Sequence, residues 1–118
     1  GLSSIPGMLT GNLKCTVNDY LDGIEHAIKV MGIEHVGLGT DFVFNVAIEQ
    51  IATSPDWQGA SVPSGGTTKE VFDDHEGFED HSKFINLTRG LVGRGYSDED
   101  IAKLMGGNWL RLMSETIG

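Results

Sequence analysis

The chain has 118 residues, of which 39% are hydrophobic and 21% are charged, a composition typical of one soluble globular unit. The formal net charge of −9 disfavours a nucleic-acid-binding protein, because that class normally presents a basic surface. The single cysteine, Cys15, excludes an internal disulfide and a cysteine metal cage. No apolar run approaches the ~20 residues of a membrane-spanning helix, and no signal-peptide pattern is recognisable, so the localisation stays open.

Residues 16–31 carry the clearest helical pattern. Thr16 is placed to cap the N-terminus, and Asp19 stands three residues later, as in a capping box. Apolar residues then recur at spacings of three and four, which places them on one face of a helix, and Gly32 follows as a terminator. The expected apolar face consists of Val17, Leu21, Ile24, Ile28 and Met31.

Residues 33–39 are expected to form a short β-strand that ends at Thr40-Asp41. A helix, a glycine and a short apolar strand in succession form an αβ unit, which builds parallel sheets. Residues 1–13 are expected to be the end of a preceding strand that runs into a loop. A carboxylate after a parallel strand lies at the edge where barrel and doubly wound enzymes place their chemistry.

The pattern weakens after this strand. Residues 42–53 are expected to form a short helix, and residues 54–81 a long irregular stretch that contains a dense acidic run. A second amphipathic helix is expected over residues 82–94, and Gly95 ends it. Its predicted buried side consists of Phe84, Leu87, Leu91 and Val92.

Two further helices are expected near the end of the sequence. Ser97, followed by three acidic residues, is a capping signature for a helix that runs to about Met105. Gly106-Gly107 interrupts it, and Asn108 is expected to cap a last helix. The predicted apolar side of that helix consists of Trp109, Leu110, Leu112 and Met113.

Four histidines raise the question of a metal site, although none belongs to a His-Glu-x-x-His motif. His26 is expected to be half-buried on the helix 16–31, and His35 to start the strand at the end opposite Asp41. His75 and His81 flank an acidic run whose oxygen and imidazole groups could bind a divalent ion. A solvated loop is the more common outcome of such a run and is favoured here.

Asp41 is the strongest candidate for chemistry. It is interpreted as a proton-transfer carboxylate or a metal ligand at the mouth of a barrel, or as an aspartate that only caps the next segment. The residues alone leave these alternatives open. Gly37-Leu38-Gly39 is not a dinucleotide fingerprint, since the third glycine and the following helix are missing, and no serine stands in a Gly-x-Ser-x-Gly setting.

Three segments carry a resemblance to a known family. Residues 31–42 read MGIEHVGLGTDF, residues 77–84 read GFEDHSKF, and residues 94–111 contain RGYSDEDI and GGNWLR. In this order and spacing they resemble the signature segments of the renal, or membrane, dipeptidase family (peptidase family M19), a group of amidohydrolase-type metal-dependent hydrolases. The resemblance covers most of residues 16–113 and is specific because the three segments occur together.

The resemblance implies an α/β fold, the C-terminal part of a (β/α)8 barrel, with residues 1–118 a portion of one dipeptidase domain. These residues would supply the end of strand seven, its helix, strand eight and the terminal helices. The implied activity is hydrolysis of dipeptides through a water that bridges two zinc ions. The family's metal ligands lie in segments that precede the matched portion, so zinc is not expected to be fully bound here. His75 and His81 stay weak candidates for a metal.

The family's site residues carry over at few positions. Asp41 matches the aspartate at the end of strand eight, which in the family hydrogen-bonds the bridging water and shuttles its proton, and Phe42 matches the aromatic beside it. Glu79 and Asp80 are expected to be structural caps near the barrel mouth. Asn108 and Arg111 also look structural.

Two departures from the family pattern put the substrate in doubt. Val43-Phe44 follows Asp41-Phe42 where many members continue with Asp-Gly, and Ile5-Pro6 stands where many carry a substrate-facing aromatic. They make Ile5 a site-adjacent candidate and point to a divergent bacterial-type branch. A barrel needs roughly 250 residues, so this chain is expected to be inactive alone.

The expected strands would have open edges, so self-association or the missing N-terminal part of the barrel is expected to cover them. The alternative function is a non-catalytic acidic binding or assembly module that keeps the barrel's C-terminal fold.

Overall fold

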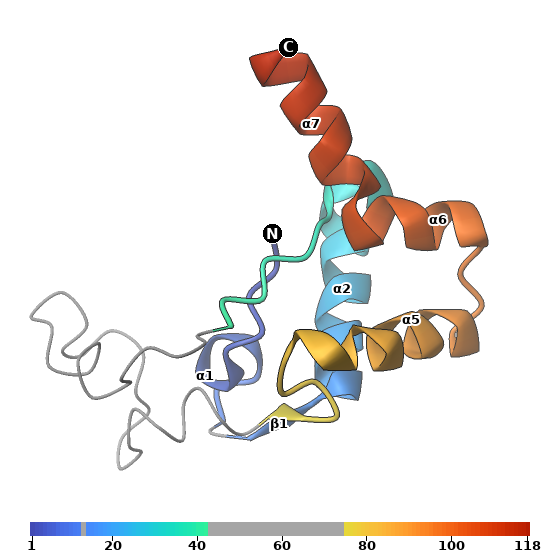
Figure 1. Ribbon diagram of the computed structural model, residues 1–118. Coiled ribbons are helices and arrows are strands. Elements are labelled where there is room, and N and C mark those ends of the chain that lie inside the picture. The colour runs from blue at the N-terminus through green and yellow to red at the C-terminus, as the bar shows by residue number, and fades with distance from the viewer. Residues whose placement is uncertain (13, 43–74) are drawn as a thin grey trace, which may run out of the picture.

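The computed structural model describes residues 1–12, 14–42 and 75–118 (Figure 1). This part of the chain is mostly helical, although the sequence predicts an α/β protein. Its α-helices are α1 (Pro6–Leu9), α2 (Val17–Met31), α5 (Phe84–Gly93), α6 (Asp98–Ala102) and α7 (Asn108–Ile117). The shorter elements are the 3₁₀ turns η1 (Ile33–His35) and η2 (His81–Lys83), the π-helical turn η3 (Lys103–Gly107), and the strands β1 (Cys15–Thr16) and β2 (His75–Glu76).

Helix α2 is the central element and agrees closely with its prediction. The side chain of Thr16 accepts a hydrogen bond from the Asp19 amide, and the Asp19 carboxylate accepts one from the Thr16 amide, which completes a capping box. Gly32, at φ 83°, ends the helix in a backbone conformation that glycine adopts without steric cost. Met31 is 51% exposed, so its predicted place on the buried face is wrong. It lies in the last turn of α2.

The core lies between α2 and the later helices. Tyr20, Leu21 and Ile24 of α2 pack in one cluster with residues of α5, α6 and η3. Gly90 of α5 lies against Leu21, whose Cδ1 leaves no room for a Cβ at that position. Arg94, which follows α5, forms ion pairs with Asp22 (2.6 Å) and Glu25 (3.1 Å) of α2. The other buried members are Val36, Phe78, Leu87, Leu91, Ile101 and Leu104.

The helices after residue 80 follow the sequence pattern, with one correction to the buried side of α5. Gly95 (φ 83°) follows α5, and the Ser97 hydroxyl accepts from the Asp100 amide at the start of α6, as predicted. Val92 is 57% exposed and does not belong to the buried side of α5. The predicted break lies at Gly106, within η3, whose non-helical φ of 155° kinks the chain between α6 and α7.

The predicted strand over residues 33–39 is largely wrong. Residues 33–35 form the turn η1, closed by the His35 amide on the Gly32 carbonyl. Only Leu38 forms a β-bridge, which is parallel and joins it to Leu2. The extended segments around these two residues nevertheless run side by side (Figure 1). The Leu2 amide donates to the Gly37 carbonyl (2.9 Å), and the Gly39 amide donates to the Leu2 carbonyl (3.1 Å).

The other strand pair is also short and parallel, with Cys15 opposite His75 and Thr16 opposite Glu76. The loop predicted within residues 1–13 contains the helix α1, which begins at Pro6, because proline is favoured in the first turn of a helix. The helix predicted over 42–53, from residue 43 onward, and the irregular stretch up to residue 74 lie outside the described residues.

Candidate active site around Asp41

Asp41 lies directly after the extended segment that pairs with residues 2–4. The Ser4 amide donates to the Thr40 carbonyl (3.3 Å), which continues the parallel hydrogen bonding to the residue before Asp41. Asp41 therefore lies at the carboxyl end of two parallel segments, and its side chain is exposed. In α/β enzymes, catalytic groups lie at this end of parallel strands.

The backbone of Asp41 is unusual. Its φ of 59° is the one positive φ outside glycine among the residues that the structure describes. This left-handed conformation brings the Cβ of an L-residue close to backbone and costs roughly 1–2 kcal/mol. Such a conformation persists where neighbouring contacts hold it, and it is concentrated at functional sites.

Two buried hydroxyl groups lie beneath this edge. Ser4 is 1% exposed, and its Oγ donates to the Thr40 carbonyl at 2.6 Å. The hydroxyl of Tyr20, which is also 1% exposed, donates to the Leu2 carbonyl at 2.6 Å. Burial raises the pKa of Tyr20 well above its ordinary value, and the negative charge of Asp41 raises it further. The phenol therefore stays protonated and remains a donor.

Neither residue was predicted from the sequence to belong to the site. Tyr20 adjoins Leu21 on the expected apolar face of the helix, and this is the signal that could have placed it in the core. Ser4 gave no signal of its own, because its partner is 36 residues away.

Phe42 lies in an aromatic cluster. Its ring makes edge contacts with Phe78 (5.1 Å between centroids), His81 (5.0 Å) and Phe84 (6.4 Å). Such contacts contribute about 0.5–1.5 kcal/mol beyond area burial. Phe42 is therefore a packing residue of the segment that carries Asp41. Ile5 is only 2% exposed. The substrate-adjacent roles of Phe42 and Ile5 stay predictions.

The described residues show no metal centre, and the candidate site at His75 and His81 stays a prediction. In residues 1–12, 14–42 and 75–118, no group of three or more His, Cys, Asp or Glu residues is arranged to hold an ion. His81 is exposed and lies against Phe42, while the side chain of His75 lies outside the described part. His26 is exposed rather than half-buried, so that prediction is wrong, and His35, also exposed, lies in η1.

Of the two acidic residues predicted to be caps, Asp80 is the N-cap of η2, whereas Glu79 binds the amide of Gly77 and caps no described helix. The Glu79 carboxylate accepts from the Gly77 amide (2.9 Å), and Asp80 accepts from the Ser82 amide (2.7 Å) at the start of η2. The Gly77 amide holds the pKa of Glu79 below its ordinary value. The hydroxyl and amide of Ser82 do the same for the pKa of Asp80. Both carboxylates are therefore engaged in local structure.

The first turn of α7 binds the backbone that leads to Asp41. The side-chain amide of Asn108 donates to the carbonyls of Ile33 and Val36, both at 2.7 Å, and Arg111 donates to the Glu34 carbonyl at 2.8 Å. Asn108 is thus not an N-cap, contrary to the prediction, but a structural link across the chain. Arg111 also forms an ion pair with Glu115 (3.1 Å), which agrees with its expected structural role.

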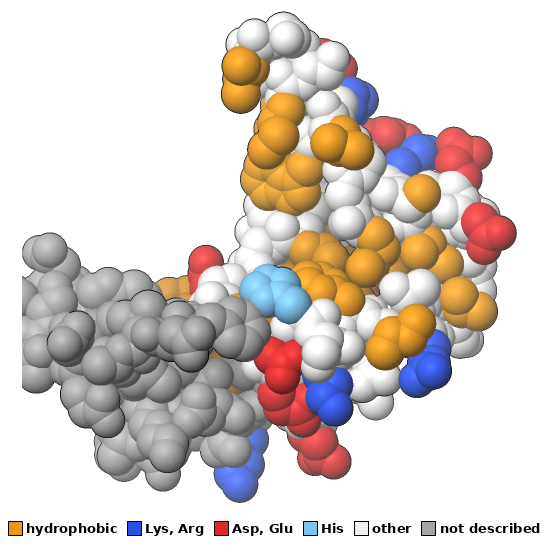
Figure 2. Space-filling view, in the orientation of Figure 1, with side chains coloured by type: hydrophobic (Ala, Val, Ile, Leu, Met, Phe, Trp, Pro, Cys, Tyr) orange, Lys and Arg blue, Asp and Glu red, His pale blue; other side chains and the backbone are white. Residues whose placement is uncertain are grey.

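The apolar side of α7 is exposed in the described structure. Hydrophobic side chains gather along one side of this helix (Figure 2). Trp109, Leu110, Leu112 and Met113 are all exposed, although the sequence pattern predicts a buried stripe. Among the described helices, none combines the length and apolar character that crossing a bilayer requires.

Comparison with known proteins places the chain in a family. The model of the membrane dipeptidase family (peptidase family M19) matches residues 1–58 and 46–117. The chain belongs to the membrane dipeptidase family. Its relatives include dipeptidase tcpJ of Claviceps purpurea, which is 29% identical over 86% of this chain and 18% of the relative. An uncharacterized dipeptidase of Schizosaccharomyces pombe is 34% identical over 90% of this chain and 20% of the relative.

This dipeptidase-family chain spans about a fifth of the length of these curated relatives. No solved structure matches it. The relatives named here are fungal, and the assignment to a bacterial-type branch stays a prediction. Family membership confirms the resemblance that the three sequence segments carry.

Proposed function

We propose that this chain supplies the strand-eight aspartate, Asp41, to the active site of a dipeptidase, and that the complete polypeptide hydrolyses dipeptides. One observation supports this most directly. An exposed carboxylate, in a costly backbone conformation, stands at the carboxyl end of two parallel segments in a chain of the membrane dipeptidase family. The dipeptidases of Claviceps and Schizosaccharomyces support the same reaction class by their names.

The chemistry assigned to Asp41 is proton transfer. Hydrolysis of a peptide bond requires that a water molecule lose a proton as its oxygen attacks the scissile carbonyl. The Asp41 carboxylate accepts that proton and then delivers it to the leaving amine, so that one carboxylic acid and one amine are released. An exposed aspartate can reach both positions, because general acid–base transfer needs only hydrogen-bond distance or one intervening water.

Zinc, which the family resemblance implies, does not fit the described residues by themselves. They contain no cluster of three potential ligands, so a metal centre would need ligands from elsewhere in the polypeptide. No part of the mechanism proposed for Asp41 is assigned to the metal.

The architecture proposed for the complete protein is a (β/α)8 barrel to which this chain contributes two neighbouring strand ends and terminal helices. The parallel pairing around Leu2 and Leu38 supports this arrangement, since parallel strands are buried on both faces and need neighbours on both edges. The remaining four-fifths of the relatives' length would supply those neighbours. The chain alone is therefore expected to be inactive.

Release of D-alanine from Gly-D-Ala, measured by mass spectrometry, tests this function. The assay compares the isolated chain with a longer polypeptide that contains this chain and has the length of the relatives. Both proteins are treated with a chelator and then assayed with and without added zinc. Hydrolysis by the longer polypeptide alone, restored by zinc, is the expected result. A folded long polypeptide that hydrolyses no dipeptide with any divalent ion would favour the non-catalytic binding module.

A further inference from the structure

The conformation of Asp41 requires something to hold it. At φ 59° the residue carries a steric cost that glycine would avoid. Relaxation to a negative φ would rotate the carboxylate away from its present direction. The torsion φ describes rotation about the N–Cα bond relative to the preceding peptide group. The planar peptide unit between Thr40 and Asp41 is one of the two groups whose relative orientation sets φ, so a contact that holds it restrains Asp41 from the N-terminal side.

Ser4 fixes that peptide unit. Both its hydroxyl (2.6 Å) and its amide (3.3 Å) donate to the Thr40 carbonyl, which is the oxygen of the peptide unit in question. The amide bond belongs to the parallel pairing and would exist with any residue at position 4 except proline. The hydroxyl bond is shorter and depends on serine. Two donors on one carbonyl oxygen restrain rotation of the peptide plane more than one donor would.

Ser4 is itself held in place from below. It is 1% exposed, and its own carbonyl accepts a hydrogen bond from Cys15 Sγ at 3.8 Å. Two residues earlier on the same segment, the Leu2 carbonyl accepts from the buried hydroxyl of Tyr20. These hydrogen bonds restrain the segment that carries Ser4. Ser4 therefore restrains, through Thr40, the exposed residue that follows.

We infer that Ser4 is a positioning residue for Asp41, whose hydroxyl holds the Thr40–Asp41 peptide unit and thereby aims the catalytic carboxylate. The inference rests on the proposed function of Asp41. Loss of the hydroxyl lowers turnover by roughly 10- to 100-fold, since misplacement of a catalytic group by about 1 Å costs on the order of 100-fold. Substrate binding changes little, because Ser4 is buried beneath the site.

The test uses Ser4→Ala and Ser4→Cys in the polypeptide of the relatives' length, with Gly-D-Ala as substrate. Ser4→Ala leaves the Thr40 carbonyl with the Ser4 amide as donor, so no buried acceptor is orphaned. The Ser3 hydroxyl accepts from the Ile5 amide instead of donating to Thr40, which makes Ser3→Ala the matched control. The expected order of kcat is wild type, then Ser4→Cys, then Ser4→Ala, with KM within about 3-fold of wild type.

Two results would overturn the inference: a kcat for Ser4→Ala equal to that of Ser3→Ala, or a fall in kcat that only follows loss of folded protein. Thermal unfolding of each variant detects the second case. A double variant adds a further measurement, the residual kcat, which distinguishes a positioning role from a purely structural one. In an Asp41→Asn background, Ser4→Ala lowers the residual kcat no further, because the residue through which it acts is already gone.

Failure of this inference is distinguishable from failure of the proposed function. If Asp41→Asn keeps wild-type turnover, the role of Asp41 fails and that of Ser4 fails with it. If Asp41→Asn loses turnover while Ser4→Ala does not, the proposed function stands and only the positioning role is wrong.

Discussion

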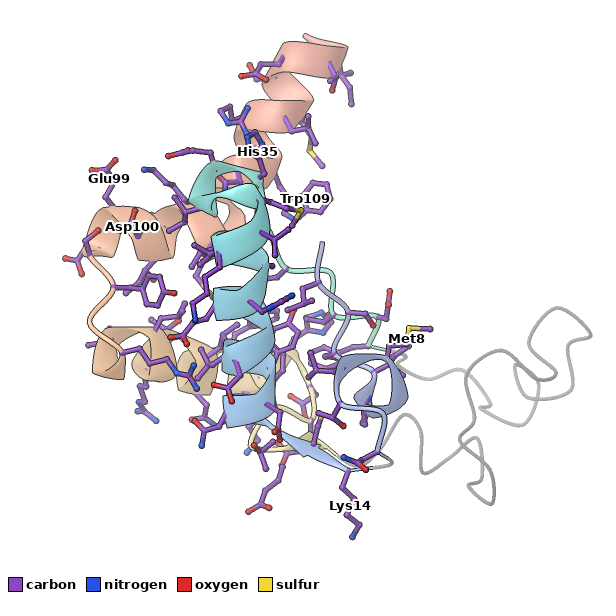
Figure 3. The ribbon with its side chains drawn as sticks, turned by 180° about the vertical axis from the view of Figure 1, so that it is seen from behind. Met8, Lys14, His35, Glu99, Asp100 and Trp109 are labelled. Atoms are coloured by element: carbon purple, nitrogen blue, oxygen red, sulfur yellow. The ribbon has the colours of Figure 1, made fainter. Side chains whose placement is uncertain are left out.

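The indole of Trp109 lies directly against Gly37, so closely that a Cβ on that glycine would come within 2.6 Å of Nε1. From this position Nε1 donates to the Leu38 carbonyl at 2.9 Å. Trp109 stands in the first turn of α7, beside the turn that follows α2 (Figure 3). A contact across 71 residues thus ties the last described helix to the segment that carries Asp41.

Gly37→Ala tests this contact. The new methyl group must displace a rigid indole and break its hydrogen bond, so the free energy of unfolding falls by about 1–3 kcal/mol, as for other overpacked sites. Urea unfolding followed by circular dichroism measures the change. Gly93→Ala is the control, because Gly93 has no neighbouring atom within 4 Å at the Cβ position. Equal stability of the two variants would show that the indole does not restrict position 37.

Asn108→Ala removes both donors to the turn after α2. The carbonyls of Ile33 and Val36 lose their partner at a position that is 7% exposed, so the free energy of unfolding falls by roughly 2–3 kcal/mol. Asn108→Asp costs more, since a carboxylate then faces two carbonyl oxygens. Chemical denaturation ranks the variants against Asn12→Ala in an exposed loop. An Asn108→Ala protein as stable as Asn12→Ala would contradict the assigned link.

The capping box of α2 predicts that substitutions of Thr16 and Asp19 lower the free energy of unfolding non-additively. Thr16→Ala or Asp19→Ala alone lowers the free energy of unfolding by about 1 kcal/mol, because each removes one side of a reciprocal arrangement. The double variant loses less than the sum, since the hydroxyl of Thr16 also donates to Asp19 Oδ2 at 2.8 Å. Thermal unfolding of the wild type, the two single variants and the double variant measures this coupling in a double-mutant cycle. Strict additivity would mean that the two side chains act independently.

We expect Asp80 to make the free energy of unfolding depend on pH in the acidic range. Hydrogen bonds from the hydroxyl and amide of Ser82 hold its folded-state pKa below the unfolded value. Its contribution is therefore complete above the unfolded pKa of about 4 and is lost as the pH falls through the folded pKa. Asp80→Asn makes the decline in unfolding temperature below about pH 5 shallower. Ser82→Ala moves the titration of Asp80 toward its ordinary range, which NMR of the carboxyl carbon detects; an unmoved titration would exclude the hydroxyl as a cause.

The helix starts and stops that depend on neighbouring residues were predicted correctly from the sequence. The capping box of Thr16 and Asp19, the stop at Gly32 and the start at Ser97 are each decided within four residues, and each is confirmed. The family segments placed Asp41 after an extended segment, and the structure agrees. Predictions failed where a distant partner decides the outcome.

Asn108 has the residue type of an N-cap, but carbonyls more than 70 residues away bind its side chain instead. The strand predicted over residues 33–39 is mostly turn, because its periodicity cannot reveal that α7 supplies hydrogen-bond donors to three carbonyls within residues 33–36. Val92 and Met31 follow the apolar period of their helices, yet no described element covers them. Ser4 has no motif at all, and only the three-dimensional pairing with Thr40 identifies it.

The most direct measurement of the central claim is the kcat of Asp41→Asn for Gly-D-Ala, in a polypeptide of the relatives' length. Asparagine keeps the size of the side chain and tolerates a positive φ, but it cannot accept the proton. The account predicts that turnover falls by at least about 100-fold, as general acid–base groups usually contribute, while an Asp98→Asn control keeps its rate. Turnover of Asp41→Asn equal to that control would contradict the claim that this carboxylate transfers the proton.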